Sequence, residues 1–517
     1  MTGVSGARLP SAFPDAIMLS RVKLAAFAVA VLAILVAGCN GAKKSATPAP
    51  AAAAKSSAQK PPPTQHFFSR PDLKPPLVRV QTAAHGTAPG YLFLAPKMVV
   101  AQAGPLIMDN RGEVVWFRPL NTRGVTDFRV QKYRGKPVLT WWRGHVSNVG
   151  VGDGWYVIYD TSYSPVAEVR PGNGLIGDVH EFLITPRNTA VFTVYHRLPV
   201  DLSSVGGPKK GKVWDGIVQE VDIETGHVLF EWHSYPQVGV KESYAPPPPA
   251  KAGAKAPPYD YFHINSIDVE LDGNFLVSAR NTHTIYEIGR KTKKVLWRLG
   301  GKKSDFAMGT GTTFAWQHDA RRHANGTITI FDNGAAPPVE KFSRVLVLHV
   351  DTKTKKASLL RSYRHPKRLL VPFEGNAQFL ANGNVVVGWG AQPYVSELGR
   401  DGSVRFDAYF GHGLPPGKDA DSYRAYRFVW HGKPTDRPAL AVGGTTAYVS
   451  WNGATDVRRW QVLAGSDAKH LKPVQEAAKT GFETPIRLEK PAAFFAVKAL
   501  GRNGEVLGTS RTIKPSS

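Results

Sequence analysis

The chain contains 517 residues, of which 42% are apolar, and 65 Lys and Arg against 40 Asp and Glu give it a formal charge of +25. This apolar content excludes global disorder, and the length predicts two or more domains. The single cysteine excludes an internal disulfide framework, a Cys-based zinc finger and a Cys-ligated iron–sulfur cluster. The charge is compatible with nucleic acid, anionic lipid or small anionic substrates as partners.

The N-terminus has the pattern of an export signal. Residues 24–37 are almost entirely apolar and follow Arg21 and Lys23. The run is shorter than the roughly 20 residues of a membrane-spanning helix. It ends in Val-Ala-Gly-Cys, which resembles the lipobox of bacterial lipoproteins. The resemblance implies a lipoprotein signal over 1–39 in which Cys39 becomes the lipidated first residue of the mature protein; a plain cleaved signal is the alternative.

Residues 40–76 are rich in Ala, Pro, Lys and Ser, a composition that does not form a core. We therefore expect a disordered linker between the anchor and the first domain. The protein is expected to be exported and held on the cell membrane by its lipid, facing outside the cytoplasm. Because an exported protein does not meet chromosomal DNA, no nucleic-acid partner is expected.

Two β-hairpin units alternate through residues 77–434. The first is an apolar run, a turn with Asp, Thr or Gly, and a second β-prone run. Its copies cover 107–117, 158–169, 220–232, 287–299, 349–360 and 397–410. The second unit covers 131–142, 183–195, 269–280, 321–334 and 378–390, and residues 90–96 can supply one more.

Two hairpins per repeat make a four-stranded sheet, so six repeats predict an all-β fold, a six-bladed β-propeller over 77–434. Residues 423–430 are expected to close the ring by pairing with the first blade. A large irregular β-sandwich is the alternative for the same segments.

Histidines recur at one position of the second unit. His180, Asn265 and His318 each lie eight residues before the turn residue of their hairpin, and His263 lies two residues before Asn265. Equivalent positions of successive blades converge around a propeller axis, so three imidazoles are expected to gather at one end of the channel. Arg280 ends the strand that follows His263 and is expected to lie near them.

Two kinds of chemistry suit such a cluster. Three histidines can hold zinc with one open position, and Glu181, Asp319 or Glu374 can orient the rings or complete the site. Alternatively, a neutral imidazole can attack an electrophilic sulfur or phosphorus atom while cations bind the oxygens of the anion. A guanidinium such as that of Arg280 matches tetrahedral oxyanions through paired hydrogen bonds.

Three segments, 260–280, 316–327 and 375–390, resemble the bacterial arylsulfotransferase family, and the likeness extends over roughly residues 88–430. The resemblance implies a six-bladed propeller that moves a sulfuryl group from a phenolic sulfate ester to another phenol. The transfer passes through a covalent sulfohistidine and needs no nucleotide donor, so no cofactor and no metal are expected. An aryl sulfate donor and a phenolic acceptor are the expected partners.

By motif match, the resemblance implies that His318 is the nucleophile. The oxygens of the sulfate would be held by His180, His263 and Arg280, and one of these histidines would handle the phenolic proton. Asn265 and Asn376 are expected to contact the substrate. Two other functions remain open: a non-catalytic propeller that acts as an envelope scaffold, and a metal-dependent hydrolase of sulfate or phosphate esters.

A composition change after residue 434 marks a second domain. Residues 435–517 contain short alternating segments separated by Asn-Gly turns, which predict a small β-sandwich. Trp451 and Trp460 are expected in its core. The pattern resembles fibronectin type III or similar immunoglobulin-like domains, and together with the lipobox it places the chain with a lipoprotein branch of the family.

Overall fold

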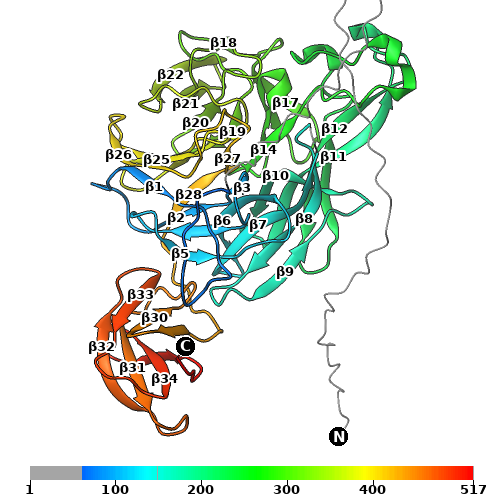
Figure 1. Cartoon of the computed structure of the whole chain (residues 1–517). Coiled ribbons are helices and arrows are strands. Elements are labelled where there is room, and N and C mark those ends of the chain that lie inside the picture. The colour runs from blue at the N-terminus through cyan, green and yellow to red at the C-terminus, as the bar shows by residue number, and fades with distance from the viewer. Residues whose placement is uncertain (1–60, 148, 516–517) are drawn as a thin grey trace, which may run out of the picture. The chain divides into compact units, whose positions relative to one another are not determined.

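The computed structural model describes residues 61–147 and 149–515, and these are all-β with only short 3-10 helices (Figure 1). The predicted signal, Cys39 and the first part of the predicted linker lie outside the described residues. No helix among the residues described has the length and apolar character that crossing a membrane requires.

Many of the sheets have four antiparallel strands, as the paired hairpins predicted. The first half of the fold contains β2 (Tyr91–Leu94), β4 (Leu106–Met108), β5 (Val114–Phe117), β6 (Gly124–Tyr133), β7 (Lys136–Val146), β8 (Gly152–Tyr159), β9 (Pro165–Val169), β10 (Gly177–Ile184), β11 (Thr189–Val200), β12 (Gly211–Asp222) and β13 (Val228–His233). The strands β6 to β13 form one continuous sheet.

Three further sheets follow along the chain. Their main strands are β14 (Ile264–Val269), β15 (Phe275–Ala279), β16 (Thr284–Ile288), β17 (Val295–Gly300), β19 (His318–Arg322), β20 (Thr327–Asp332), β21 (Arg344–Asp351), β22 (Lys356–Tyr363), β23 (Asn376–Phe379), β24 (Val385–Gly388), β25 (Tyr394–Leu398) and β26 (Val404–Tyr409). The strand β28 (Ala425–Phe428) joins β2, β4 and β5 in the first sheet. Two short strands, β1 (Arg79–Thr82) and β18 (Ala307–Met308), lie at sheet edges. The short strands β3 (Lys97–Met98) and β27 (Ala420–Asp421) pair with each other in a separate sheet.

We call β28, β6, β10, β14, β19 and β23 the leading strands, because each is the first strand of its four-stranded group. Each leading strand contacts the next in this order, and β23 contacts β28, so the contacts close into a ring. The strand β28 pairs antiparallel with β2, as predicted for the segment 423–430. The hairpin turns need a left-handed residue, and Gly273 (φ 87°) and Gly326 (φ 81°) supply it at the predicted positions.

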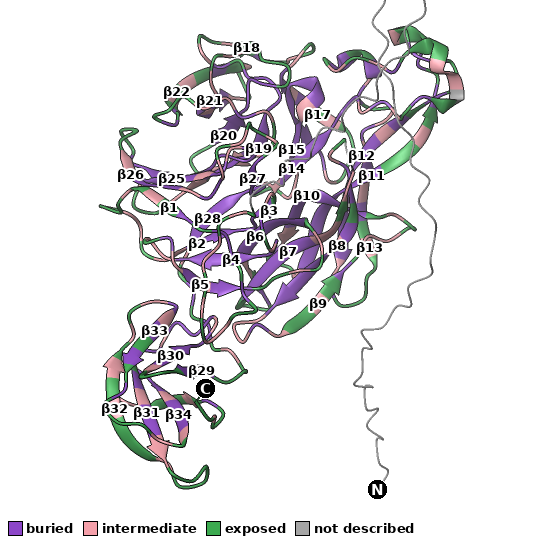
Figure 2. Cartoon of the chain, in the orientation of Figure 1, coloured by how far each residue is buried: buried purple, intermediate pink, exposed green. Residues whose placement is uncertain are grey.

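The core lies between neighbouring sheets, since most residues of the leading strands and their partners are buried (Figure 2). A buried ion network ties the leading strands together. Glu181 of β10 accepts hydrogen bonds from Arg424 (Nη1 to Oε1, 2.9 Å), Arg321 of β19 (Nη2 to Oε2, 2.6 Å) and Arg129 of β6. Arg424 also pairs with Asp127 of β6 at 2.9 Å. Segments far apart in the sequence therefore depend on one another for charge compensation.

The predicted linker, 40–76, is wrong in its last part. Thr64 forms a β-bridge with Pro76, and the Ser69 amide donates to Glu483 at 2.6 Å. The side chain of Leu73 is 1% exposed and packs in a cluster with Leu106, Val114, Phe117 and Phe482. The segment is rich in Ala and Pro, but a few of its apolar residues pack against the neighbouring sheets. Burial of these side chains is sufficient to order the segment.

Replacing Leu73 by alanine is expected to lower the free energy of unfolding by about 2–5 kcal/mol, the range for a buried leucine. Denaturant unfolding measures the loss. Leu77→Ala is the matched control, because Leu77 is 38% exposed and its truncation removes little buried surface. Equal effects of the two substitutions would contradict the packing of this segment.

The C-terminal residues form two further sheets. One contains β29 (Ala439–Gly443), β30 (Thr446–Ser450) and β33 (Glu483–Arg487), and the other contains β31 (Arg459–Gly465), β32 (Lys472–Ala478), β34 (Phe494–Leu500) and β35 (Val506–Thr509). Trp451 and Trp460 belong to the apolar cluster of these sheets, as predicted. The amide of Asn452 bonds both backbone groups of Phe117, at 3.0 and 2.9 Å, and joins this region to β5.

Candidate functional site

The three predicted histidines gather at the leading strands. His180 lies in β10, His263 directly precedes β14, and His318 begins β19. The ring centroids of His180 and His263 are 5.0 Å apart. The ring of Tyr423 lies 5.7 Å from that of His180 and 6.4 Å from that of His318. Residues at equivalent positions of the sequence repeat therefore lie close together in the structure.

The backbone at these positions is irregular, which aims the side chains. The pairing register shifts between Gly177 and Phe182, between Ile264 and Ser266, and between His318 and Arg321. Such bulges re-aim side chains and are common beside active sites. His263 itself has a left-handed backbone, φ 56°, which is costly for a residue with a Cβ and is maintained only by the surrounding fold.

Each imidazole is held through its Nδ1 atom. His180 Nδ1 lies 2.5 Å from the Asp178 carboxylate, and His263 Nδ1 lies 2.5 Å from that of Asp260. His318 Nδ1 lies 2.7 Å from Asn333 Oδ1. These partners fix the ring orientations and leave Nε2 as the atom of each ring that can meet a ligand.

The tautomer of His318 follows from Asn333. The Asn333 amide nitrogen donates to the carbonyls of Val371 (3.1 Å) and Glu374 (2.9 Å), so its oxygen must face the histidine. His318 therefore carries its proton on Nδ1, and Nε2 accepts the Glu374 backbone N–H at 3.2 Å. Burial, together with the positive charge of Arg280, holds the pKa of His318 well below its ordinary value. The ring is neutral, with a lone pair on Nε2.

Arg280 is a half-buried cation without a carboxylate partner in an ion pair among the described residues. Its guanidinium donates to Asn281 Oδ1 at 2.9 Å and to the carbonyls of Ala336 and Pro372, both at 3.3 Å. Its Cζ lies 4.8 Å from the ring centroid of Trp316. Burial lowers the pKa of Arg280 to about 10, so the group stays charged at neutral pH. A half-buried cation outside any ion pair, beside a neutral nucleophile, favours an anionic ligand.

The two predicted asparagines differ. Asn265 donates to the Gln317 carbonyl at 2.7 Å, while its buried Oδ1 has no partner among the residues described. Asn376 uses both ends of its amide on the backbone of Ala425, donating at 2.9 Å and accepting at 2.8 Å. The prediction that Asn376 contacts substrate therefore disagrees with the structure, which makes it a link between β23 and β28.

The carboxylates named as possible ring partners have other roles. Glu181 and Asp319 belong to the buried ion network, where Asp319 Oδ1 pairs with Arg321 at 2.6 Å. Glu374 Oε1 pairs with Lys97 at 2.8 Å, and burial raises the pKa of Glu374 to about 7. In the described part of the chain, the ring nitrogens of the three histidines do not all lie within 4.8 Å of one another, so this arrangement is not a ready three-imidazole zinc site.

Sequence reasoning missed Asn333, Tyr423 and Lys97. Asn333 stands in Asp-Asn-Gly, which has the appearance of an ordinary turn. Tyr423 lies in the segment predicted to close the ring, so its central position followed from that prediction although its contact with the histidines did not. Lys97 belongs to β3, which no repeat marks.

Among solved structures, the chain shows distant likenesses. A protein of unknown function from Bacteroides caccae is 12% identical over 65% of this chain and 98% of its own, with a TM-score of 0.38. A protein from Lactobacillus plantarum is 11% identical (76% and 97% covered, TM-score 0.34), and virginiamycin B lyase from Staphylococcus aureus is 8% identical (72% and 96%, TM-score 0.29). These values carry no argument about function.

No curated protein matches the chain. The protein-family model described as arylsulfotransferase (ASST) matches residues 129–411, which include the three histidines and Arg280. Because this match spans more than half of the sequence, the chain belongs to the arylsulfotransferase family.

Proposed function

We propose that this protein is an aryl sulfotransferase that moves a sulfuryl group from a phenolic sulfate ester to a phenol, without a nucleotide donor. Family membership suggests the reaction and the aryl sulfate substrates. The observation that carries the proposal is the neutral Nε2 of His318 close to the unpaired guanidinium of Arg280. A nucleophile and an oxyanion-binding cation are the two groups that sulfuryl transfer needs.

In the first step, Nε2 of His318 gives up the Glu374 N–H and attacks the sulfur of the ester. The nitrogen–sulfur bond forms while the bond from sulfur to the aryl oxygen breaks, and the oxygen leaves with the electron pair. His318 keeps its Nδ1 proton, so the sulfohistidine ring is cationic and Asn333 Oδ1 stabilises it. Arg280 binds the sulfuryl oxygens through the transfer.

In the second step, the oxygen of the acceptor phenol attacks the same sulfur. The nitrogen–sulfur bond breaks, its electron pair returns to Nε2, and the phenolic proton passes to His263 or His180. Burial lowers the pKa of His263, which keeps this ring neutral and able to accept a proton. Asn265 completes the set of substrate contacts.

We also propose that the closed ring of leading strands is the centre of a six-bladed β-propeller and that residues 435–517 form a fibronectin-like sandwich. The cyclic contacts of the leading strands and the shared core of the two C-terminal sheets support this. The lipid anchor at Cys39 and the position outside the cytoplasm are proposed from the sequence. Mass spectrometry that finds an unmodified thiol at Cys39 would refute the anchor.

One assay tests the proposed reaction against its alternatives. The protein is incubated with 4-nitrophenyl sulfate, with and without phenol, and with and without a chelator. We expect release of nitrophenol that requires phenol and yields phenyl sulfate, unaffected by the chelator. Turnover that needs no phenol and stops with the chelator would identify a metal-dependent hydrolase, and no turnover at all would favour the scaffold.

The role of Asn333 is tested by Asn333→Ala. Because Nδ1 of His318 then loses its acceptor, we expect kcat to fall by about 10- to 100-fold, the range for partners that orient an imidazole, with little change in KM. Asn333→Asp is the matched variant. The new carboxylate favours the charged imidazole, so the acid limb of the kcat profile should move to higher pH. Identical pH profiles for this variant and the wild type would contradict the contact.

A further inference from the structure

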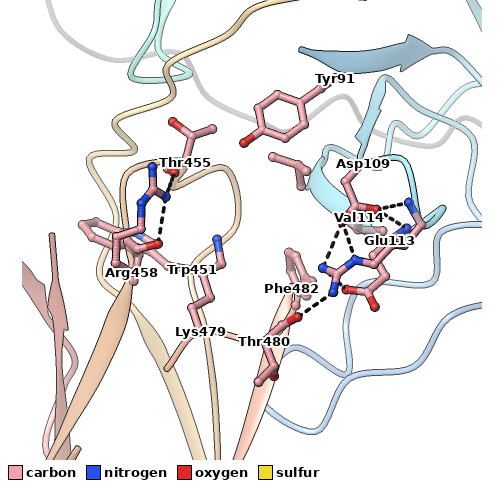
Figure 3. Close-up of a pocket in the computed structure, with 14 residues that line it drawn as sticks. Tyr91, Asp109, Glu113, Val114, Trp451, Thr455, Arg458, Lys479, Thr480 and Phe482 are labelled. Atoms are coloured by element: carbon pink, nitrogen blue, oxygen red, sulfur yellow. Dashed lines mark hydrogen bonds and ion pairs between the residues drawn. The ribbon is translucent and has the colours of Figure 1, made fainter. Parts of the chain in front are cut away.

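A cavity of about 210 Å³ lies between the C-terminal sheets and the strands β2 and β5, away from the histidines (Figure 3). Arg458, Lys479 and Trp451 line it on the C-terminal side, and Tyr91 and Asp109 line it on the other. Pairing of Arg459 with Ala478 across β31 and β32 sets two cations side by side, since the Lys479 amide donates to the Arg458 carbonyl at 2.9 Å.

Neither of these cations has an ion-pair partner among the described residues. Lys479 Nζ donates to the Ala454 carbonyl at 3.1 Å. Arg458 uses only Nη1, toward the carbonyls of Thr455 (3.0 Å) and Val457 (3.3 Å). The remaining donors of both side chains have no partner among the described residues, so the cavity holds two adjacent cations, neither of which is in an ion pair.

The acidic groups near the cavity are already occupied. Asp109 and Glu113 both pair with Arg111, at 3.0 and 3.2 Å. Burial and the repulsion of Arg458 and Arg111 lower the pKa of Lys479 to about 8, against the weaker opposing effect of Asp109 and Asp456. A bound anion would stabilise the charged form of Lys479 and, by binding only the folded protein, the fold itself.

We propose that this cavity binds a tetrahedral oxyanion, sulfate or phosphate, held by Lys479 and Arg458 with the hydroxyl of Tyr91 as a further donor. A guanidinium offers paired N–H groups to two oxygens, and an ammonium and a hydroxyl reach the others from different sides. The Tyr91 hydroxyl has no hydrogen bond within the described residues and faces the cavity across from the two cations (Figure 3). The anion thereby joins β2 to the C-terminal sheets.

Isothermal titration of the full chain with sodium sulfate, and separately with sodium phosphate, at ionic strength held constant with sodium chloride, tests this site. At pH 8 the heat should depend on the buffer, because Lys479 takes up a proton as the anion binds. Lys479→Met should weaken binding at least about tenfold, the loss expected for a charge-assisted hydrogen bond. Lys472→Met is the matched control, since Lys472 is an exposed cation at the start of β32, the strand that ends directly before Lys479.

Two further measurements keep the outcome clear. Arg280→Met removes the cation of the proposed active site. Sulfate binding that persists in Arg280→Met and is lost in Lys479→Met is therefore binding at the cavity. This conclusion holds whether or not the protein transfers sulfuryl groups. Without added anion, Lys479→Met should unfold at the wild-type denaturant concentration or above, because the substitution removes the repulsion between Lys479 and the neighbouring Arg458. If Lys479→Met binds sulfate and phosphate with wild-type affinity, the proposed site is refuted. A preference of the wild type for one of the two anions identifies the ligand.

Discussion

Replacing His318 by alanine is expected to lower the rate of sulfuryl transfer by about 10⁴-fold or more, as removal of the nucleophile does in covalent hydrolases. The reason is geometric: Nε2 of His318 carries a lone pair near Arg280, and the Nδ1 contact with Asn333 fixes that tautomer. The measurement is steady-state transfer from 4-nitrophenyl sulfate to phenol. After a rapid acid-free quench, a peptide containing His318 should carry one sulfuryl group in the wild type only.

His323→Ala is the matched control for this experiment. His323 follows β19, and its ring contacts Thr329 Oγ1 at 2.9 Å, so its loss should leave transfer close to the wild-type rate. The pH dependence gives a second check. Because the pKa of His318 lies well below 6.5, its neutral form persists through mild acid, and protonation of this ring should not slow transfer between pH 7 and 6. Retained transfer in His318→Ala would refute the sulfohistidine.

Replacing Glu181 by alanine is expected to lower the free energy of unfolding by about 3–5 kcal/mol, the cost of breaking a buried ion network from one side. The substitution leaves Arg129, Arg321 and Arg424 buried around a missing carboxylate. Denaturant unfolding followed by tryptophan fluorescence measures the loss. Glu168→Ala is the control, since its 54% exposed side chain pairs with Arg170 at 3.4 Å, and such surface pairs contribute about 0–1 kcal/mol.

The same network predicts an acid dependence of stability. Burial alone would raise the pKa of Glu181, but the three guanidiniums outweigh it and hold the pKa far below the ordinary 4.5. A carboxylate whose pKa is depressed by folding stabilises the fold above its unfolded pKa, and this contribution is lost as the pH falls through the folded value. The stability gap between the wild type and Glu181→Ala should therefore narrow below pH 4.5. A constant gap would contradict the charge pairing.

Much of the strand pattern could be predicted, because hairpin turns require particular residues. A left-handed residue is needed at these second-unit turns. The turn residues eight positions after His180, Asn265 and His318 are Asn188, Gly273 and Gly326, and all have positive φ, at 62°, 87° and 81°. A fixed distance from those turns placed His180 and His318 at equivalent positions. The proximity of the imidazole rings could then be predicted, because equivalent positions of successive repeats converge on the same axis.

The failures have a different cause. Residues 64–76 were predicted to be part of a linker because of their composition. Composition does not show which apolar residues become buried against other parts of the fold, and Leu73 is one that does. Asn376 was expected to contact the substrate, together with Asn265, because of the resemblance to the arylsulfotransferase family. In the structure its amide faces the Ala425 backbone, which only the closure of the ring brings there.

By itself the sequence determined the hairpins, their repetition and the positions of His180, His263, His318 and Arg280, since these depend on local turn chemistry and on spacing along the chain. The tertiary structure alone decided the tautomers, hydrogen bonds and ion pairing of these side chains. The tautomer of His318 depends on Asn333. Arg280 has no ion-pair partner among the described residues, and the nearby carboxylate of Asp260 is bonded to His263. Hydrogen bonds and charges act through space, so partners far apart in the chain leave no local pattern for a sequence to display.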